Sequence, residues 1–518
     1  MRNRISVETG RFRPGALLLL GLLAALTVIV ASCGTDPEMP IHRTGPIWTP
    51  AGSPAAASSE DGAWPGFDFD AARSGFNPNE KTLTSATVGG LHRLWSVALP
   101  AVADSTPILV PHLSFPDGSR RDVLYLTTKP GSLVALDAAT GNIFWVAKTS
   151  GPRYTTSSPV ANLAHGVIYS YGLDGKLHQY RATTGQEVTG GGWPVLITTM
   201  PASEKGSSAL NLGNGYIYVA TGGYPGDAPP YQGHVVAIDT TDGTSHVFNS
   251  LCSDRAHVLA HNECSQNTSG IWSRAGVTID PITGNIFMAT GNGDFDANKG
   301  GHDWGDTVLE LNADATRLID SYTPSNFQEL QDGDTDLGSA SPALLPTIPN
   351  SHTPYLAVQV GKDGQLRLLD RQNLSGQGGP GHVGGALQTI NAPGGCDTLS
   401  QPAVWTDPAN GQIWLFVTNS CGVGGYQAVT AGDGTTTLRQ VWEVKRGATS
   451  PVVAGGVLFA ATGGNLFALD LHTGHQLWSS TDRSAGGSIG GIHWESPIVA
   501  GGRLYCTDEN GRLTAYGL

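Results

Sequence analysis

Ala135-Leu-Asp-Ala-Ala-Thr-Gly-Asn-Ile-Phe-Trp145 and Ala468-Leu-Asp-Leu-His-Thr-Gly-His-Gln-Leu-Trp478 are two copies of one pattern, A-L-D-x-x-T-G-x-x-x-W, and weaker copies lie between them. A repeat of this kind defines the architecture before any single residue is interpreted. In each copy an apolar run leads into an Asp-to-Gly turn, and a β-prone aromatic run follows. With a second hairpin upstream, each copy predicts about four strands, which is one blade of a β-propeller.

The chain contains eight such units. They span about residues 104–147, 157–195, 206–248, 269–324, 338–374, 397–444, 447–480 and 493–518. The last unit ends before its fourth strand, and residues 91–99 are predicted to supply that strand and remove the open sheet edge. The Trp after each T-G is predicted to pack between neighbouring blades. A β-solenoid and two stacked sandwiches are the alternatives, but the blade-length spacing favours a propeller.

The repeat resembles the tryptophan-docking repeat of the pyrroloquinoline quinone (PQQ)-like propeller family. The resemblance covers about residues 64–518 and begins with Trp64-Pro-Gly-Phe-Asp-Phe-Asp-Ala-Ala-Arg-Ser-Gly-Phe-Asn-Pro78. It implies an all-β, eight-bladed PQQ-like β-propeller closed by N- and C-terminal strands. The family holds quinoprotein dehydrogenases and also non-enzymatic relatives, such as a lipoprotein scaffold of the outer-membrane β-barrel assembly machinery. The resemblance therefore indicates the fold more sharply than the activity.

Residues 1–33 resemble a bacterial lipoprotein signal peptide. A basic start is followed by an apolar run over residues 16–31, which is short for a transmembrane helix, and the run ends beside Cys33 in a lipobox-like sequence. This implies that Cys33 is lipidated and anchors the chain to a membrane. An uncleaved anchor helix and an ordinary secretory signal are the alternatives. Residues 34–63, rich in Pro, Ala and Ser, are predicted to be a flexible tether before the propeller of residues 64–518.

Composition limits the partners. The formal net charge is −14 and the sequence has no basic stripe, so we expect no nucleic-acid binding. We expect a monomer in the cell envelope, lipid-anchored and extracytoplasmic, either periplasmic or on the cell surface. Its predicted partners are the membrane, through the lipid, and a protein or small-molecule ligand.

The other cysteines fit an oxidising compartment. Two pairs bracket irregular loops and are predicted to form disulfides: Cys252 with Cys264, and Cys396 with Cys421. Cys506 lies in a predicted strand and is expected to be a buried thiol. A zinc site is the alternative for the first pair, but it lacks a C-x-x-C spacing. Its ligands would be Cys252, His257, His261 and Cys264.

The dehydrogenase branch of the family implies roles for three residues where the chain departs from its own repeat. Asn292, in a T-G-N turn, matches a calcium ligand, and an amide oxygen suits that hard cation. Asp336, in an acidic turn that ends in Gly, matches the catalytic base and a second calcium ligand, with Asp334 as the alternative. Lys362, before Asp363-Gly364, matches the residue that contacts the quinone.

Other positions depart from that branch. The Trp expected beneath the quinone ring falls at Arg274, although Trp272 is two residues away, so both are candidate cofactor contacts. The expected calcium-binding Glu falls in residues 224–233, where only Asp227 could substitute for it. The chain also has no adjacent Cys pair and no C-x-x-C-H motif for an attached haem.

These observations give two hypotheses for function. The first is a membrane-anchored binding or scaffold module, in which Asn292 holds a turn, Asp336 caps a backbone and Lys362 is solvated. The alternative is a divergent oxidoreductase that depends on PQQ and calcium and acts on an alcohol or a sugar. Whether the chain is an enzyme is therefore left open. The enzyme hypothesis requires that the three residues converge on one cavity.

Overall fold

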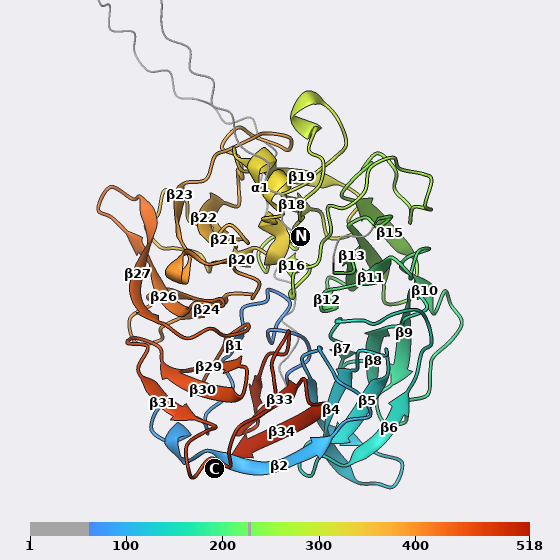
Figure 1. Cartoon of the computed structure of the whole chain (residues 1–518), viewed down its shortest axis with the longest axis vertical. Coiled ribbons are helices and arrows are strands. Elements are labelled where there is room, and N and C mark those ends of the chain that lie inside the picture. The colour runs from blue at the N-terminus through green and yellow to red at the C-terminus, as the bar shows by residue number, and fades with distance from the viewer. Residues whose placement is uncertain (1–61, 226–228) are drawn as a thin grey trace, which may run out of the picture. The chain divides into compact units, whose positions relative to one another are not determined.

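Eight mainly antiparallel sheets form a ring (Figure 1). The computed structural model describes residues 62–225 and 229–518, all within one of the two compact units of the chain. Each sheet consists mainly of consecutive strands joined by short turns, so the blades follow one another around the ring in chain order. The predicted eight-bladed, all-β propeller is confirmed.

The first four blades contain the following strands. Blade 1 holds β3 (Ile108–Ser114), β4 (Arg120–Thr127), β5 (Leu133–Asp137) and β6 (Ile143–Ala147). Blade 2 holds β7 (Val160–Asn162), β8 (Val167–Tyr171), β9 (Lys176–Arg181) and β10 (Val195–Leu196). Blade 3 holds β11 (Glu204–Gly206), β12 (Asn211–Gly213), β13 (Tyr216–Gly223), β14 (His234–Asp239) and β15 (Ser245–Asn249). Blade 4 holds β16 (Thr278–Ile279), β17 (Ile286–Ala289), β18 (Val308–Leu311) and β19 (Leu318–Tyr322).

The other four blades complete the ring. Blade 5 holds β20 (Ala343–Leu344), β21 (Leu356–Val360), β22 (Gln365–Asp370) and β23 (Gln388–Asn391). Blade 6 holds β24 (Ala403–Thr406), β25 (Ile413–Thr418), β26 (Val423–Thr430) and β27 (Thr436–Val444). Blade 7 holds β1 (Phe76–Asn77), β28 (Val452–Ala454), β29 (Val457–Thr462), β30 (Asn465–Asp470) and β31 (Gln476–Ser479). Blade 8 holds β2 (His92–Ala98), β32 (Ile498–Ala500), β33 (Arg503–Asp508) and β34 (Arg512–Gly517).

Helical structure is short and lies between strands. The described residues include α1 (Phe327–Gly333) and the 3₁₀ turns η1 (Val88–Gly90), η2 (Ala297–Lys299), η3 (Leu337–Ser339) and η4 (Pro393–Gly395). None of these helices has the length and apolar character needed to cross a membrane. The fifth unit extends further than the sequence predicted, because its outer strand β23 follows a long loop and lies beyond residue 374.

The ring is closed by strands from both ends of the propeller. Strand β2 pairs antiparallel with β34, from His92 opposite Gly517 to Ala98 opposite Arg512 (Figure 1). The predicted closure is therefore confirmed. Blade 8 combines β2, from the N-terminal part of the propeller, with β34, its last strand, so the ring cannot open without separating β2 from β34.

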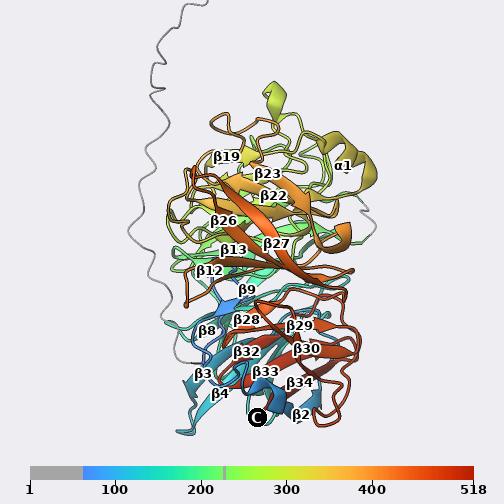
Figure 2. The same ribbon diagram turned by 90° about the vertical axis from the view of Figure 1, so that its left-hand side faces the viewer.

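The repeated Trp residues join neighbouring blades. The indole N–H of Trp145 donates to the carbonyl of Ala182 at 3.1 Å, and that of Trp478 donates to Leu91 at 2.9 Å. The Gly of the next T-G turn is needed for close packing, because a Cβ at Gly185 would lie 2.6 Å from the Trp145 ring. Figure 2 shows neighbouring blades stacked face against face. The core lies between them, where strands such as β25 and β29 are buried along nearly their whole length.

The segment from Trp64 to Asn77 crosses the inner strands of several blades. Its backbone bonds to Leu109, Ala161, Ile279, Val404 and Val453. Its strand β1 adds to β28 in parallel. Buried Arg73 donates to the carbonyls of Phe67 at 2.6 Å and Leu210 at 2.8 Å. This segment therefore braces the centre of the ring, a role that the sequence did not predict.

Both predicted disulfides are present, Cys252–Cys264 and Cys396–Cys421. The zinc alternative is therefore wrong, because the two sulfurs it required are bonded to each other. Cys506 is a free, buried cysteine in β33, as expected. Cys33 lies outside the described residues.

Candidate functional site

Asp336, Lys362 and Asn292 meet beside the inner ends of blades 4 and 5. The backbone N–H of Asn292 donates to Oδ1 of Asp336 at 2.6 Å, and Nζ of Lys362 forms an ion pair with Oδ2. Nζ also lies 3.3 Å from Oδ1 of Asp334. The three residues follow β17, α1 and β21, so the fold brings together segments that are well separated in sequence.

Glycines make this close approach possible. A Cβ at Gly291 would lie 2.5 Å from Oδ1 of Asp336, and one at Gly338 would lie 2.4 Å from the carbonyl carbon of Thr290. Any larger residue at either position would separate the T-G-N turn from the acidic turn. Upstream of Asp336, the chain leaves α1 through Asp334, whose left-handed conformation (φ 52°) ends the helix. The T-G-N turn and the acidic turn, which are separate motifs in the sequence, therefore pack directly against each other.

Burial governs the charges here. The Asp336 side chain is 3% exposed, and burial raises the pKa of its carboxyl while Lys362 opposes that rise. Burial acts to lower the pKa of Lys362, but Asp336 and Asp334 outweigh it, so the pKa lies above its ordinary value. Lys362 is thus the counterion of a buried carboxylate and not a solvated turn residue.

Trp272 lines a cavity of about 220 Å³ together with Asp336 and Lys362. Nζ of Lys362 lies 5.2 Å from the centroid of the Trp272 ring, and Trp494 lies edge-on to that ring at 6.2 Å. Asp336, Lys362, Trp272 and Arg274 all line the cavity, together with Lys205 and Tyr224. The side chain of Asn292 is not among the lining groups. Of the three motif residues, Asn292 reaches the site only through its backbone.

Arg274 separates this cavity from a second one of about 350 Å³. Its guanidinium donates to the carbonyls of Thr156 and Asp104, each at 2.8 Å, and lies 5.8 Å from the Trp494 ring. It also lies 5.9 Å from the ring of Phe67, in the segment that braces the ring. Arg274 is therefore held at the centre of the site through its two terminal nitrogens, whereas its Nε has no hydrogen-bond partner among the described residues.

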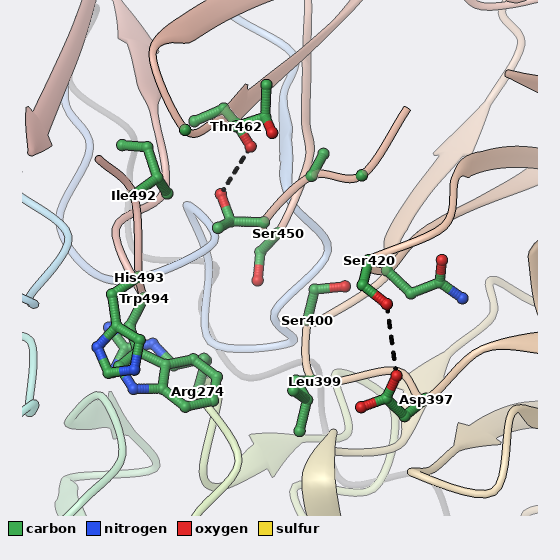
Figure 3. A pocket seen from close by; sticks show the side chains of 16 residues that line it. Arg274, Asp397, Leu399, Ser400, Ser420, Ser450, Thr462, Ile492, His493 and Trp494 are labelled. Carbon is green, nitrogen blue, oxygen red and sulfur yellow. Dashed lines mark hydrogen bonds between the residues drawn. The ribbon is translucent and has the colours of Figure 1, made fainter. Parts of the chain in front are cut away.

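The lining of the second cavity is mostly apolar and includes several hydroxyl groups (Figure 3). Ser400, Ser420 and Ser450 lie on one side, and Leu399 and Trp494 add apolar surface. Hydroxyls beside an aromatic ring suit a neutral ligand that carries both apolar and hydroxyl groups. The cavity is next to the first one and shares Arg274 and Trp494 with it.

The sequence missed several groups of this region. Buried Asp306 accepts a bond from the N–H of Leu337 at 2.9 Å, its second carboxyl oxygen has no partner among the described residues, and burial raises its pKa to about 8. Trp494 and Lys205 were also not singled out, because neither belongs to a repeated motif. Only their positions in space place them beside Trp272.

A further acidic group surrounds Lys129. Ligand-type atoms of Asp104, His493 and Glu509 lie within 4.8 Å of one another. Nζ of Lys129 lies 3.2 Å from Oδ1 of Asp104 and 2.9 Å from Oε1 of Glu509, so a cation of the protein already neutralises the group. Burial acts to raise the pKa of Asp104, but bonds from His493 and the charge of Lys129 hold it well below its ordinary value.

Residues 64–374 match the family model of the glucose/ethanol/alcohol dehydrogenase β-propeller domain, a PQQ family. The chain belongs to this family. Residues 399–517 match a second model, that of the outer membrane protein assembly factor BamB. The two matches divide the propeller, and the candidate residues Asp336, Lys362, Asn292, Trp272 and Arg274 all lie within the dehydrogenase part.

Curated relatives of the family point in the same two directions. The dehydrogenase subunit of a quinone alcohol dehydrogenase from Gluconobacter oxydans is 22% identical over 71% of this chain and 51% of its own length. A polyvinylalcohol dehydrogenase from a Pseudomonas species is 23% identical over 50% of this chain and 40% of its own length. BamB of Escherichia coli is 37% identical over 17% of this chain and 20% of its own length. The chain spans about half the length of the first of these relatives.

Solved structures of the family share the fold. A europium-containing methanol dehydrogenase superposes with a TM-score of 0.63 at 16% identity, covering 89% of this chain and 99% of that one. A quinohemoprotein alcohol dehydrogenase from Pseudomonas putida HK5 gives 0.61 at 15% identity, covering 88% and 80%. Similarity at this level supports the architecture and leaves the activity to be argued from the site.

The residues of the site fit the quinone of this PQQ family better than they fit calcium. PQQ is a planar aromatic tricarboxylate, and the cavity offers the Trp272 ring with the basic side chains of Lys205, Lys362 and Arg274. Calcium needs six to eight oxygen ligands, and both oxygens of Asp336 are already occupied by Lys362 and by the N–H of Asn292. Among the described residues, the group of three metal-type ligands is the one at Asp104. Asp227 lies outside the described residues.

Proposed function

We propose that this chain is an oxidoreductase that binds a quinone of the PQQ type and oxidises an alcohol or a sugar. One observation carries the proposal: Asp336, Lys362 and Trp272, from three separate segments, line one cavity. A solvated Lys362 and an isolated Asp336 would have favoured a propeller that kept only the architecture. Of the three residues that the enzyme hypothesis required on one cavity, Asp336 and Lys362 line it, whereas Asn292 contacts Asp336 through its backbone N–H and does not line the cavity.

Asp336 has the environment of a general base. Burial raises the pKa of its carboxyl, which makes it a better proton acceptor than an exposed Asp, and Lys362 acts against that rise and favours the ionised form. The N–H of Asn292 fixes Oδ1, so the carboxylate keeps one orientation. Asp336 would take the hydroxyl proton of the substrate. No step is assigned to a metal ion.

The other residues bind and position. The bound quinone would supply the two-electron acceptor for the oxidation. The Trp272 ring would stack on it, and Lys362, at 5.2 Å from that ring, would face its oxygens. The second cavity, which shares Trp494 with the first and has several hydroxyl groups in its lining, would receive the alcohol or sugar (Figure 3).

A second function has its own support. The C-terminal part of the propeller matches the BamB model, and 90 residues are 37% identical to BamB of E. coli. A binding or scaffold module, the first hypothesis from the sequence, would use loops of this part to hold a protein partner. In either case we propose that Cys33 is lipidated and that the tether of residues 34–63 holds the propeller at a membrane outside the cytoplasm.

The test is retention of the cofactor. The full chain, solubilised in mild detergent, is mixed with PQQ, with and without Ca²⁺, and then separated from free quinone by gel filtration. We expect about one bound quinone per chain, and a loss of at least tenfold in affinity for Lys362→Met, because an ammonium–anion contact in a dry site contributes about 1.5–3 kcal/mol. Exposed Lys445, replaced in the same way, is the matched control.

Circular dichroism shows whether each variant is folded. Absence of bound quinone on a folded, β-rich wild-type chain would refute the oxidoreductase proposal and leave the binding module. Retention that is equal in Lys362→Met and Lys445→Met would place the quinone elsewhere in the protein.

A further inference from the structure

Lys205 is a buried lysine that the mechanism above does not need as a base. It lies in the middle of β11, opposite Gly222 of β13. The absence of a side chain at Gly222 leaves room for Trp272, because a Cβ there would lie 3.0 Å from that of Trp272. The backbone of blade 3 thus directs Lys205 into the same cavity as Trp272, although the residue is only 6% exposed.

The carboxylate next to Lys205 in sequence is directed elsewhere. Successive side chains of a strand point to opposite faces, so Glu204 lies on the other side of β11. There its Oε2 accepts the N–H of Gln232 at 2.9 Å, and its Oε1 lies 3.7 Å from Nδ1 of His234. Among the described residues, no carboxylate lies within ion-pair distance of Lys205.

The groups that surround the Lys205 amine are aromatic, hydroxyl or cationic. Nζ lies 5.2 Å from the centroid of Tyr154 and 5.6 Å from that of Tyr224, and it donates to Oγ1 of Thr156 at 3.2 Å. Both tyrosines are neutral near pH 7, because the ordinary pKa of a phenol is about 10 and burial raises it further. The guanidinium of Arg274 adds a positive charge near the Lys205 amine, and that of Arg153 lies 4.6 Å from the centroid of the Tyr224 ring.

The acidic groups of the neighbourhood are already paired. Asp104 attracts the amine from a distance, but its carboxylate is held by Lys129 at 3.2 Å. Asp334 and Asp336, on the other side of the cavity, are held by Lys362. Burial, followed by the charge of Arg274, lowers the pKa of Lys205 to about 7. A large fraction of this amine is therefore uncharged at neutral pH, as in lysines that react with carbonyl compounds.

We propose that Lys205 is a nucleophilic amine that captures an aldehyde or ketone in this cavity as an imine. The nitrogen lone pair of Nζ attacks the carbonyl carbon, a C–N bond forms, and a proton passes from nitrogen to oxygen. Loss of water then gives the C=N bond, so the step consumes no oxidant and no reductant. Thr156 holds Nζ in place through its hydroxyl, and the aromatic walls favour a small apolar carbonyl compound.

The proposal goes beyond quinone binding and does not depend on it. If the chain oxidises alcohols, the carbonyl product would be a natural ligand of Lys205. If it does not, the same amine would still take an aldehyde or ketone from solution. The test is therefore made on the full chain without quinone.

The experiment is reductive trapping with benzaldehyde and sodium cyanoborohydride, followed by peptide mass mapping. Lys205 is one of eight lysines in the chain, and the other seven serve as internal controls. At pH 7 an ordinary lysine has on the order of a thousandfold less free amine. Because a less basic amine is also a weaker nucleophile, we expect Lys205 to be modified about ten- to a hundredfold faster than exposed Lys445. Its rate should level off above about pH 7.

Two results would overturn the proposal: modification of Lys205 no faster than that of Lys445 at pH 7, or modification only at high pH. Lys205→Arg keeps a basic side chain of similar length and cannot form an imine, so the labelled peptide should disappear while the other lysines react as before. If that variant does not fold, the peptide map of the wild-type chain still decides, because it needs no substitution.

Discussion

Replacing Lys362 by Met should expose how much the buried Asp336 carboxylate depends on its counterion. The ammonium is removed and most of the side-chain volume is kept. Asp336 is 3% exposed and Lys362 is 22% exposed, so the pair is largely shielded from water. Removing one partner of a buried pair costs about 3–5 kcal/mol, and the partial exposure of Lys362 places the expected loss near the lower value, about 3 kcal/mol.

The loss should depend on pH with a definite sign. Burial already raises the pKa of Asp336 in the folded protein, and the variant lacks the ammonium that opposes the rise. A folded-state pKa above the unfolded one gives stability that is full below the unfolded pKa and is lost as pH rises through the folded pKa. As pH falls, protonation of the carboxyl removes its charge, and a neutral carboxyl needs no counterion. The deficit of about 3 kcal/mol should therefore be present at pH 8 and shrink greatly near pH 4.

The assay is urea unfolding followed by Trp fluorescence at both pH values. Lys445→Met is the control and should change the free energy of unfolding by less than about 0.5 kcal/mol. On an Asp336→Asn background, Lys362→Met should cost less than about 1 kcal/mol, because no buried charge is left unpaired. Equal losses on both backgrounds, or a deficit that does not change with pH, would refute the ion pair as the reason for the stability loss.

Two further predictions concern stability. Burial raises the pKa of Asp306 to about 8 in the folded protein. The protonated carboxyl therefore stabilises the fold fully below the unfolded-state pKa, and this stabilisation is lost as pH rises through 8. Asp306→Asn should remove this effect and so reduce the fall in melting temperature between pH 5 and pH 9. Glu310 and Glu495, with pKa values also raised to about 8 by burial, should leave a residual slope, and an unchanged slope would contradict the assignment. Trp478→Phe removes the 2.9 Å bond to the Leu91 carbonyl and should cost about 1–3 kcal/mol in urea unfolding. No loss would show that this contact does not hold blades 7 and 8 together.

The repeat made the fold predictable. The pattern A-L-D-x-x-T-G-x-x-x-W combines a strand, a turn that needs Gly, and an indole that needs a neighbour, and each of these requirements is local. Gly185 shows the reason, because the preceding blade places Trp145 where any Cβ would be. Closure by residues 91–99 followed from counting strands, since a blade with three strands requires a fourth.

The candidate site was predictable only in part. Asp336 and Lys362 were found because each stands in a charged turn that departs from the repeat, and the structure brings them into one ion pair. The role of Asn292 could not be read from its residue type, because it contributes its backbone N–H to Asp336. Lys205 and Trp494 belong to no motif, so nothing in the amino-acid sequence connects them with Trp272.

The amino-acid sequence by itself therefore determined the number of blades, the way the ring closes and the two disulfides. All three follow from residue types at fixed spacing, where a turn, an indole or a pair of thiols has few ways to be satisfied. Only the tertiary structure decided which charges are paired and which are not. The same ammonium group has a raised pKa at Lys362 and a pKa lowered to about 7 at Lys205, because one amine meets a buried carboxylate, whereas the other is buried without such a partner and faces the charge of Arg274.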